Sequence, residues 1–178
     1  MSEDKLLTAE GIVKSLKDEF KTKILDVQIK DRIAGSKKNA TTSIWMKVDS
    51  KAFKDIVKHL IGFQYPHLAV ASGNDLGKTI ELIYHFTVNF GHKRKQINLN
   101  ISVEVPKSKP DIQSICDLIP GALITEREKM EMLGVNIIGI PDKRRCFVPE
   151  DFPEGVYPWR RDETGPEKYY KNLHEVKK

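Results

Sequence analysis

Cysteine is scarce in this chain of 178 residues, which holds two, Cys116 and Cys146. Two cysteines cannot form the disulfide framework of a small secreted domain, nor the four-cysteine site of a structural zinc ion. Both have apolar neighbours in the sequence. We therefore expect two buried thiols that behave as small hydrophobic side chains.

Long hydrophobic runs are missing as well. The longest apolar run, Leu68–Ala71, falls far short of the roughly 20 residues that a membrane-spanning helix needs. The start of the chain, Met1–Lys5, is acidic and lacks the apolar segment of a secretory signal. We expect a cytoplasmic address, with any attachment to a membrane made through a partner.

Familiar catalytic and metal-binding patterns are also missing. The five histidines (59, 67, 85, 92 and 174) do not have the spacing of metal ligands. No Gly-x-Ser-x-Gly sequence marks a nucleophilic serine. The segment Gly73–Thr79 has three residues between its glycines where a phosphate-binding loop has four, and an alternating strand follows it, which is typical of a hairpin turn. We expect neither a metal nor a cofactor in this chain.

Charge of one sign is not concentrated in the sequence. The chain has 30 basic and 25 acidic residues, a formal charge of +5 and an isoelectric point near 9.1. The clearest basic run, His92–Lys95, follows Gly91 between two expected strands and indicates a solvated turn. Because nucleic-acid binders usually gather charge on one face, this distribution disfavours nucleic acid as a partner. The frequent Lys and Glu with only four Gln would suit a thermophile.

The first half of the chain alternates between helical and strand periodicity. It predicts a helix, two half-buried strands and a second helix, in that order, at residues 8–20, 23–33, 41–49 and 50–62. Thr8 can cap the first helix, and Ser50 and Gly62 are placed to begin and end the second. Residues 35–39 form the loop between the two strands.

Three further strands follow. Tyr65–Ser72 predicts one of them, and residues 80–90 and 97–105 alternate apolar and polar side chains so regularly that they predict two long antiparallel strands with one buried face. The order helix-strand-strand-helix-strand-strand-strand predicts an α+β fold. It is a mostly antiparallel sheet covered on one face by two helices.

The rest of the chain predicts short helices and then an extended tail. An apolar stripe at residues 112–119 predicts one short helix, and a capping box of Thr125 and Glu128 predicts another, which Gly134 would close. Five of the nine prolines lie from Pro141 onward, so regular structure should stop there and another protein should provide the surface that orders the tail. The chain thus divides into an α+β domain, a helical junction and a partner-binding tail: residues 1–106, 107–140 and 141–178.

Three glutamates of the helix near the tail could supply paired carboxylates for acid–base chemistry: Glu126, Glu128 and Glu131. At helical spacing, however, Glu126 and Glu128 point to different sides. Acids in a first turn are also explained by the helix dipole. We therefore favour carboxylates matched to a partner's arginines over catalytic carboxylates.

The same helix and tail carry a specific combination of residues: Glu126-Arg127-Glu128, Glu131, Met132-Leu133-Gly134, Gly139, Pro141–Arg145 and Pro149–Pro153. Pro120-Gly121-Ala122 upstream and Tyr157-Pro158-x-Arg160 downstream fit the same pattern. This combination resembles the signature of the 30-kilodalton subunit of respiratory complex I. That family includes equivalents in archaeal and bacterial membrane-bound hydrogenases. The resemblance is specific across residues 110–162 and rests on element order over residues 1–105.

Two departures from the family pattern indicate which kind of relative the chain resembles most. Ile140 stands where the family usually has His before Pro-Asp, and Cys146-Phe147 replaces an aliphatic pair. The chain is also short. These departures favour a hydrogenase-type or sulfane-sulfur-reductase-type relative in an anaerobic archaeon over a true NADH:quinone enzyme.

The resemblance implies a cofactor-free accessory subunit of a membrane-anchored, complex-I-like electron-transfer complex. Its tail would pack on the large subunit that corresponds to the nickel–iron hydrogenase catalytic subunit, near the small iron–sulfur subunit, and iron–sulfur clusters are expected in those partners. It implies a peripheral location on the cytoplasmic face of the membrane. The residues expected to face the partners are charged and aromatic: Glu126, Arg127, Glu128, Glu131, Asp142, Arg144, Arg145, Glu150, Asp151, Phe152, Tyr157, Trp159 and Arg160.

Arg127, Arg144 and Arg145 leave two interpretations open. They either meet acidic or carbonyl groups on the large subunit or fix the junction between helix and tail. Arginine suits both because its planar fork can bind two oxygens at once.

The alternative function is a free-standing ferredoxin-like binding domain with a disordered tail, for instance an RNA-binding module. Such a module would expose aromatic side chains on the open face of its sheet. The polar strand face here carries Asn98, Asn100, Ser102 and His85, which disfavours this alternative.

Overall fold

The computed structural model describes residues 6–34 and 39–168. Its elements, in chain order, are α1 (Ala9–Phe20), a 3₁₀ turn (Lys21–Lys23), β1 (Ile24–Ala34), β2 (Asn39–Val48), α2 (Phe53–Phe63), β3 (His67–Asp75), β4 (Thr79–Val88), β5 (Ile97–Pro106), β6 (Asp111–Gln113), α3 (Ala122–Leu133), β7 (Asn136–Ile138) and a 3₁₀ turn (Pro166–Lys168). Most of the predicted loop at 35–39, the acidic start of the chain and the last ten residues of the predicted tail lie outside the described residues.

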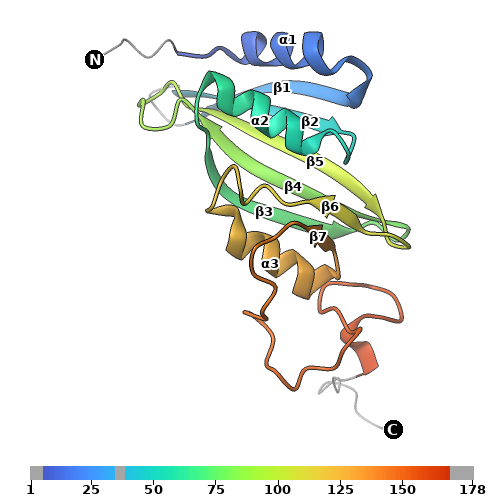
Figure 1. Ribbon diagram of the computed structural model, residues 1–178. Coiled ribbons are helices and arrows are strands. Elements are labelled where there is room, and N and C mark those ends of the chain that lie inside the picture. Colours follow the sequence, from blue (N-terminus) through green and yellow to red (C-terminus); the bar gives the residue numbers. More distant parts are fainter. Residues whose placement is uncertain (1–5, 35–38, 169–178) are drawn as a thin grey trace, which may run out of the picture.

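The fold is α+β, as predicted. Five strands form one sheet in the order β1-β2-β5-β4-β3, in which β2 and β5 run parallel and the other neighbours antiparallel. The three helices lie on the same face of this sheet (Figure 1). The sequence predicted α1 and α2 on that face, and α3 joins them over β3.

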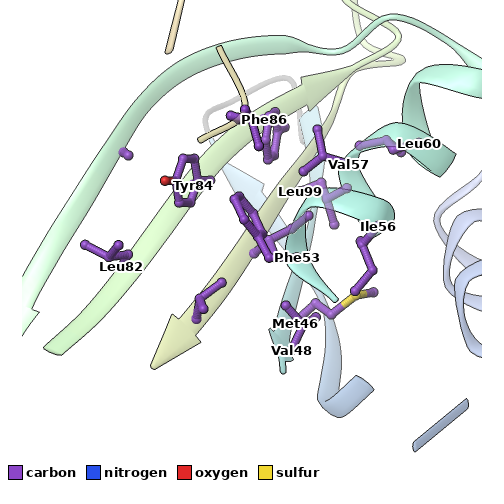
Figure 2. Packing of buried hydrophobic residues seen from close by; sticks show 14 of the residues in the cluster. Met46, Val48, Phe53, Ile56, Val57, Leu60, Leu82, Tyr84, Phe86 and Leu99 are labelled. Atoms are coloured by element: carbon purple, nitrogen blue, oxygen red, sulfur yellow. The ribbon is translucent and has the colours of Figure 1, made fainter. Parts of the chain in front are cut away.

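The core lies between this face and the helices. Alternate residues of β4 are buried from Ile80 to Val88, which confirms the predicted half-buried strand. Figure 2 shows their side chains meeting those of α2, where the Phe53 and Tyr84 rings lie 4.4 Å apart. Each such side chain, once fully buried, stabilises the fold by about 1.5–3 kcal/mol. The core therefore holds α2 and the sheet together without help from another chain.

The observed ends of the first two helices agree only in part with those predicted from the sequence. The Thr8 hydroxyl accepts a hydrogen bond from the Gly11 amide at 3.1 Å, which confirms the predicted cap of α1. The prediction for α2 was wrong at both ends, since Ala52 precedes its first turn and Gly62 lies inside its last one. Asp49, whose carboxylate accepts from the Lys51 amide at 2.8 Å, organises the turn before α2 instead.

Strand β1 is an edge strand with little burial. Leu25 is 60% and Ile33 67% exposed, although their spacing predicted a half-buried strand. A register shift between Ile24 and Asp26 interrupts the alternation, and no further strand pairs with the outer edge of β1 among the described residues. Edge position and bulge together explain why the apolar period of this strand overstates its burial.

The segment after β5 was predicted as a helix, and this was wrong. Ile112 lies in β6, which pairs in parallel with β7 opposite Ile137, and a turn over Cys116–Leu118 follows. Its apolar residues are buried nonetheless, for example Ile115 at 0% exposed. A short apolar run does not distinguish a buried helix from a buried strand by periodicity alone.

The two cysteines have different environments. Cys116 is buried, as predicted, whereas Cys146 is exposed. The apolar neighbours of Cys146 did not predict this, because Phe147 beside it is exposed as well.

Candidate partner-binding site

The predicted tail has no regular structure from residue 141 to residue 165, yet it lies on the chain's own domain. It follows the C-terminal half of α3 at the end of the molecule opposite α1 (Figure 1). The Trp159 amide donates to the Met132 carbonyl at 3.0 Å, and the Arg160 Nε donates to the Leu133 carbonyl at 2.8 Å. The surface under residues 141–168 thus belongs to the chain itself, which differs from the expectation that another protein provides it.

Arg127 fixes the junction between α3 and the tail. It is 8% exposed, and its Nε donates to the Arg144 carbonyl at 2.8 Å, while its Nη2 reaches the Arg144 and Arg145 carbonyls. Its Nη1 lies 3.3 Å from the Asp142 carboxylate. Of the two interpretations of Arg127, the structure thus shows the one in which it acts within the chain.

Glu131 and Arg145 organise the next stretch of tail. The Glu131 carboxylate accepts the amides of Cys146, Phe147 and Val148 at 2.6, 2.8 and 3.0 Å. Arg145 Nη1 donates to main-chain carbonyls, with the Phe152 carbonyl nearest at 2.9 Å. The Glu131 and Arg145 side chains thereby form the hydrogen bonds that main-chain amides and carbonyls would form with each other in a helix or strand.

Tyr157, Trp159 and Arg160 close the tail over the end of α3. Gly134 ends that helix with φ +67°, as predicted, and its missing side chain leaves room for the Tyr157 ring. The Arg160 guanidinium lies 4.3 Å from the centre of that ring, and the Lys129 ammonium lies 4.7 Å from the centre of the Trp159 ring. Both rings therefore contact the chain itself, while Trp159 remains 41% exposed, and contact of these residues with a partner remains a prediction.

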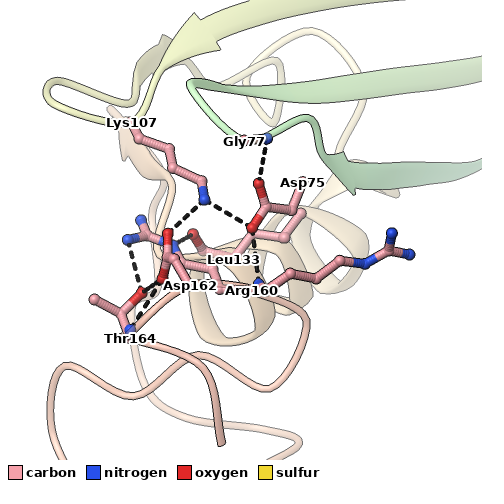
Figure 3. A network of polar contacts seen from close by, with 8 residues as sticks. Asp75, Gly77, Lys107, Leu133, Arg160, Asp162 and Thr164 are labelled. Atoms are coloured by element: carbon pink, nitrogen blue, oxygen red, sulfur yellow. Dashed lines mark hydrogen bonds and ion pairs between the residues drawn. The ribbon is translucent and has the colours of Figure 1, made fainter. Parts of the chain in front are cut away.

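A further clamp joins the tail to the β3–β4 end of the sheet (Figure 3). Lys107 is paired with Asp75 at 2.7 Å and also with Asp162. The Asp75 side chain, which is 2% exposed, also accepts the amides of Gly77 and Arg161 at 2.8 and 2.9 Å. The clamp thus ties two turns and the tail together.

The clamp shifts the pKa values of its members. Lys107 and then the Thr164 hydroxyl hold the pKa of Asp162 well below its usual value. Burial alone would raise the pKa of Asp75, but hydrogen bonds from Lys107, Arg161 and Gly77 outweigh it and leave that pKa lowered. Burial alone would lower the pKa of Lys107, but the Asp162 and Asp75 carboxylates outweigh burial and leave that pKa raised.

Acid is therefore expected to release the tail from the β3–β4 end. A carboxyl with a lowered folded pKa stabilises the fold above its ordinary value near about 4, and this stabilisation is lost as the pH falls through the folded pKa. Lys107 has a raised folded pKa, so it stabilises the fold fully below its ordinary pKa of about 10.5. This stabilisation is lost as the pH rises through the folded pKa. Trp159 fluorescence, measured in a Trp45→Phe background, should change on titration below about pH 4.

A Lys107→Met variant is the control for this titration. It should show the released signal already at neutral pH, with little further change in acid. Constant Trp159 fluorescence of the Trp45→Phe chain throughout the acid titration, with the domain still folded, would contradict the clamp.

Glu126 is fully buried, and this corrects the interpretation of it as a first-turn or partner-facing acid. Helix α3 begins at Ala122, with no side-chain cap, so Glu126 lies in its second turn. Its carboxylate accepts the Ser114 hydroxyl at 2.6 Å, the Ile115 amide at 3.1 Å and the Tyr84 hydroxyl at 3.3 Å. It therefore joins α3, β4 and the segment after β6.

The groups around Glu126 remain neutral hydrogen-bond donors. Burial, followed by the Glu126 carboxylate, raises the pKa of Tyr84 well above its usual value. Burial also raises the pKa of the Cys116 thiol to about 11, and this thiol donates to Glu126 at 3.2 Å. A thiol with so high a pKa is a poor nucleophile, so this cluster has the chemistry of a structural site.

The predicted capping box at Thr125 and Glu128 was wrong. The Thr125 hydroxyl lies inside α3 and instead bonds both main-chain groups of Ala71, accepting from its amide at 2.8 Å and donating to its carbonyl at 3.1 Å. Glu128 pairs with its neighbour Lys129. Thr125 thus docks the helix on β3 rather than beginning it.

The remaining predicted site residues lie at the surface of the tail. Asp142 accepts from Arg144, which lowers the pKa of that carboxyl, and the Arg144 side chain is 85% exposed. Glu150 and Asp151 are exposed, and Phe152 is half-buried. For these residues, contact with a partner remains a prediction.

Several residues of the site had no signal in the sequence. Lys107, Asp75 and Asp162 are far apart along the chain, and nothing in their local pattern distinguishes them from solvated charges. Outside the site, Asn89 was missed as well: it has φ +55°, is 1% exposed and bonds the main chain of Leu7. An isolated Asn after a strand was its only hint.

Within the described residues, no group of three or more His, Cys, Asp or Glu side chains is arranged to hold a metal ion. No described helix has the length and apolar character that crossing a membrane requires. On the open face of the sheet, the central strand β5 presents Asn100 and Ser102, and Trp45 of β2 is exposed beside His85. RNA-binding sheets stack bases on two or three aromatic residues of central strands. On β2, β4 and β5 this face offers Trp45, together with His85, whose ring nitrogens are already bonded to Ser72 and Asn100.

Comparison with known proteins identifies the family. Residues 46–169 match the family described as "Respiratory-chain NADH dehydrogenase, 30 Kd subunit". The chain belongs to this family. The match confirms the resemblance seen in the tail and extends it back to β2.

The relatives include hydrogenase subunits. The chain is 32% identical to the membrane-bound hydrogenase subunit beta of Pyrococcus furiosus, over 92% of this chain and 91% of that protein. It is 31% identical to formate hydrogenlyase subunit 5 of Escherichia coli over 91% of this chain, which spans 26% of that longer protein. A chain in the structure of the archaeal membrane-bound sulfane sulfur reductase has the same fold, with a TM-score of 0.66 and 18% identity over 95% of both chains.

Proposed function

We propose that this chain is a cofactor-free accessory subunit of a membrane-anchored, complex-I-like electron-transfer complex of the hydrogenase or sulfane-sulfur-reductase type. It docks on the large nickel–iron-hydrogenase-like subunit, near the small iron–sulfur subunit, at the cytoplasmic face of the membrane. Its role is to hold the cluster-bearing partners in register. Iron–sulfur clusters belong to those partners.

One observation carries this proposal. The similarity to the hydrogenase subunit beta covers 92% of this chain and 91% of that protein, so it includes the tail as well as the domain. A shared domain alone would show a shared fold. The tail is rich in proline and charge and cannot form a hydrophobic core. Its similarity in the two proteins therefore indicates a shared surface.

The longer relative supports a position beside another subunit. In formate hydrogenlyase subunit 5 a region like this chain makes up about a quarter of the polypeptide. Covalent linkage gives two domains a high effective concentration for each other. We infer that, in this chain, binding to a separate large subunit takes the place of that linkage.

The chemistry of the site fits a structural role. The charged side chains of Glu126, Arg127 and Glu131 form hydrogen bonds with groups of this chain. The thiol of Cys116 is buried with a raised pKa. No residue of the described site combines a free nucleophile with a base, so turnover is assigned to the assembled complex.

Co-purification tests the proposal. A tagged chain, isolated from solubilised membranes, should bring down the large and the small iron–sulfur subunits in equal amounts, and the chain purified alone should carry no stoichiometric iron or zinc. Recovery of the chain free of other subunits, or with RNA, would contradict the proposal.

Arg144→Ala provides a sharper variant for the same assay. Its pair with Asp142 is at the surface and is worth little to the free chain, so the thermal midpoint of that chain should hardly change. If Arg144 meets the partner, its truncation weakens assembly by about 2–5 kcal/mol. Arg32→Ala, at an exposed position of β1, is the matched control and should assemble normally. Normal assembly of Arg144→Ala with loss of turnover would assign the motif to the chemistry.

A further inference from the structure

Away from the partner-binding site, three side chains on the open face of the sheet form one chain of hydrogen bonds. The Ser72 hydroxyl of β3 lies 2.9 Å from Nε2 of His85 in β4, and Nδ1 of that ring lies 2.7 Å from Oδ1 of Asn100 in β5. Because Tyr84 and Phe86 on either side of His85 are buried beneath the helices, His85 lies on the face that the three helices leave open (Figure 1). Strand pairing thus brings a hydroxyl, an imidazole and an amide into line across β3, β4 and β5.

The direction of these hydrogen bonds follows from Asn100. Its Nδ2 can only donate, and it donates to the Ile44 carbonyl at 3.3 Å, so Oδ1 of the same amide is the atom that faces His85. Because Oδ1 can only accept, Nδ1 of His85 carries the proton. Nε2 is then the bare nitrogen of the neutral imidazole, and the Ser72 hydroxyl donates to it. The imidazole is thus held in the tautomer that can take the proton of this hydroxyl.

This hydrogen-bond chain borders an open hollow on the sheet. The hollow has a volume of about 380 Å³, and its lining includes His85, Trp45, Thr87 and Asn98 but no Asp, Glu, Lys or Arg residue. Ser72 and His85 are both half-buried, so small molecules can reach them. Trp45 is 39% exposed, and the centre of its ring lies 6.4 Å from that of His85. An uncharged ligand with an aromatic ring fits such a lining.

We propose that Ser72 is an activated nucleophile that uncharged aryl esters acylate, with His85 as its general base and Asn100 as the residue that positions the imidazole. A hydroxyl bonded to a base that a third group orients is the arrangement that nucleophilic catalysis requires. Main-chain amides within a sheet pair between strands and give the developing oxyanion little help, so the substrate needs a good leaving group. This activity goes beyond the proposed function, because it requires no other subunit.

The reaction is an acyl transfer followed by hydrolysis. The Ser72 Oγ forms a bond to the ester carbonyl carbon while Nε2 of His85 takes the hydroxyl proton. The bond between that carbon and the phenol oxygen then breaks, and Nε2 returns the proton to the departing phenolate. Water, deprotonated by the same nitrogen, attacks the acyl-serine, and the Ser72 oxygen leaves with that proton. The products are a phenol and a carboxylic acid, and the serine is regenerated.

Two probes test this inference on the purified full chain. A fluorophosphonate should form an adduct at Ser72, found by peptide mass spectrometry, as Oγ displaces fluoride from phosphorus, and para-nitrophenyl acetate should release nitrophenolate. Ser72→Ala should abolish both signals, and His85→Gln should lower both rates about 100-fold. Ser15→Ala is the matched control and should leave both rates unchanged. Ser15 also bonds a histidine, His59 at 3.2 Å, but no group in the described part of the chain bonds the other nitrogen of that ring.

Asn100→Asp separates positioning of the imidazole from bracing of the sheet. It keeps the acceptor for Nδ1 of His85 and should preserve the labelling of Ser72, whereas Asn100→Leu removes that acceptor and should slow it. Ester hydrolysis that survives in Ser72→Ala would overturn the proposal. So would a fluorophosphonate adduct that forms no faster at Ser72 than at Ser15 in the unaltered chain, since the hydrogen-bond chain would then have a structural role alone. Neither result bears on co-purification, so the proposed function is tested separately.

Discussion

Replacing Glu126 by alanine is expected to destabilise the whole domain by about 3–5 kcal/mol, out of a total stability of about 5–15 kcal/mol. The substitution leaves the Ser114 hydroxyl, the Ile115 amide and the Tyr84 hydroxyl buried without their acceptor. Each stranded donor costs about 1–3 kcal/mol, and partial relaxation reduces the sum. Urea unfolding should show this as a lower midpoint with a similar slope.

Two variants control this experiment. Glu126→Gln keeps the size and one acceptor oxygen, so it should cost about 1–2 kcal/mol. Glu19→Ala removes an exposed helical glutamate from α1 and should stay within about 0.5 kcal/mol of the unaltered chain. A Glu126→Ala chain as stable as Glu19→Ala would show that the buried carboxylate does not hold α3 to the sheet.

Replacing Gly134 by alanine is expected to detach the tail from α3. A Cβ atom there would meet three carbons of the Tyr157 ring, two of them at 2.6 and 2.7 Å, which real contacts do not reach, and the residue has φ +67°. The backbone strain alone costs about 1–2 kcal/mol. The ring must also move, which removes its stacking on Arg160. Limited proteolysis should then cut the chain between residues 141 and 165 much faster while the domain stays folded.

Gly155→Ala separates the clash from the strain. Gly155 also lies in the tail and has φ +74°, but nothing lies within 4 Å of a Cβ atom at that position. The Gly155→Ala variant should therefore have the backbone strain without the clash, and its tail should stay in place. Equal proteolysis of the two variants would show that Tyr157 does not pack against Gly134 in solution.

The sheet and two of its helices could be predicted because burial imposes a period on their sequences. The alternation of β4 and β5 and the stripe of α2 each place apolar side chains on one face, and the structure confirms them. Prediction failed at residues 112–119, where both faces of a short segment are buried and no period distinguishes strand from helix. It failed for the capping box because tertiary contact with Ala71, rather than the helix end, uses the Thr125 hydroxyl.

The candidate site was predictable in its residues but not in their partners. Arg127 and Glu131 stood out by their types and spacing, yet a sequence does not show whether a charge meets another chain or its own main chain. The expectation of an unsupported tail rested on its shortage of apolar residues. That shortage is offset here by hydrogen bonds from charged side chains to main-chain groups, and by the long-range clamp at Lys107, which local patterns do not show.

This arrangement gives the family signature a physical role. Glu126 holds α3 to the sheet, Arg127 and Glu131 hold the tail to α3, and Gly134 makes room for Tyr157. The exposed side chains of the tail are thereby presented in a fixed arrangement. In the proposed function, partners meet this fixed surface, so variants of the signature should act on assembly through the shape of the tail.

Hydrogen exchange of the isolated chain, resolved by mass spectrometry to short peptides, tests this account most directly. The amides of Cys146, Phe147 and Val148, which Glu131 binds, and those of Tyr157 and Trp159, which bond the Thr164 and Met132 carbonyls, should be protected without any partner. Glu131→Gln should reduce protection at the first three and leave the last two unchanged. Exchange of all five at the rate of an unstructured peptide, beside a protected sheet, would show that the tail acquires its structure only on a partner.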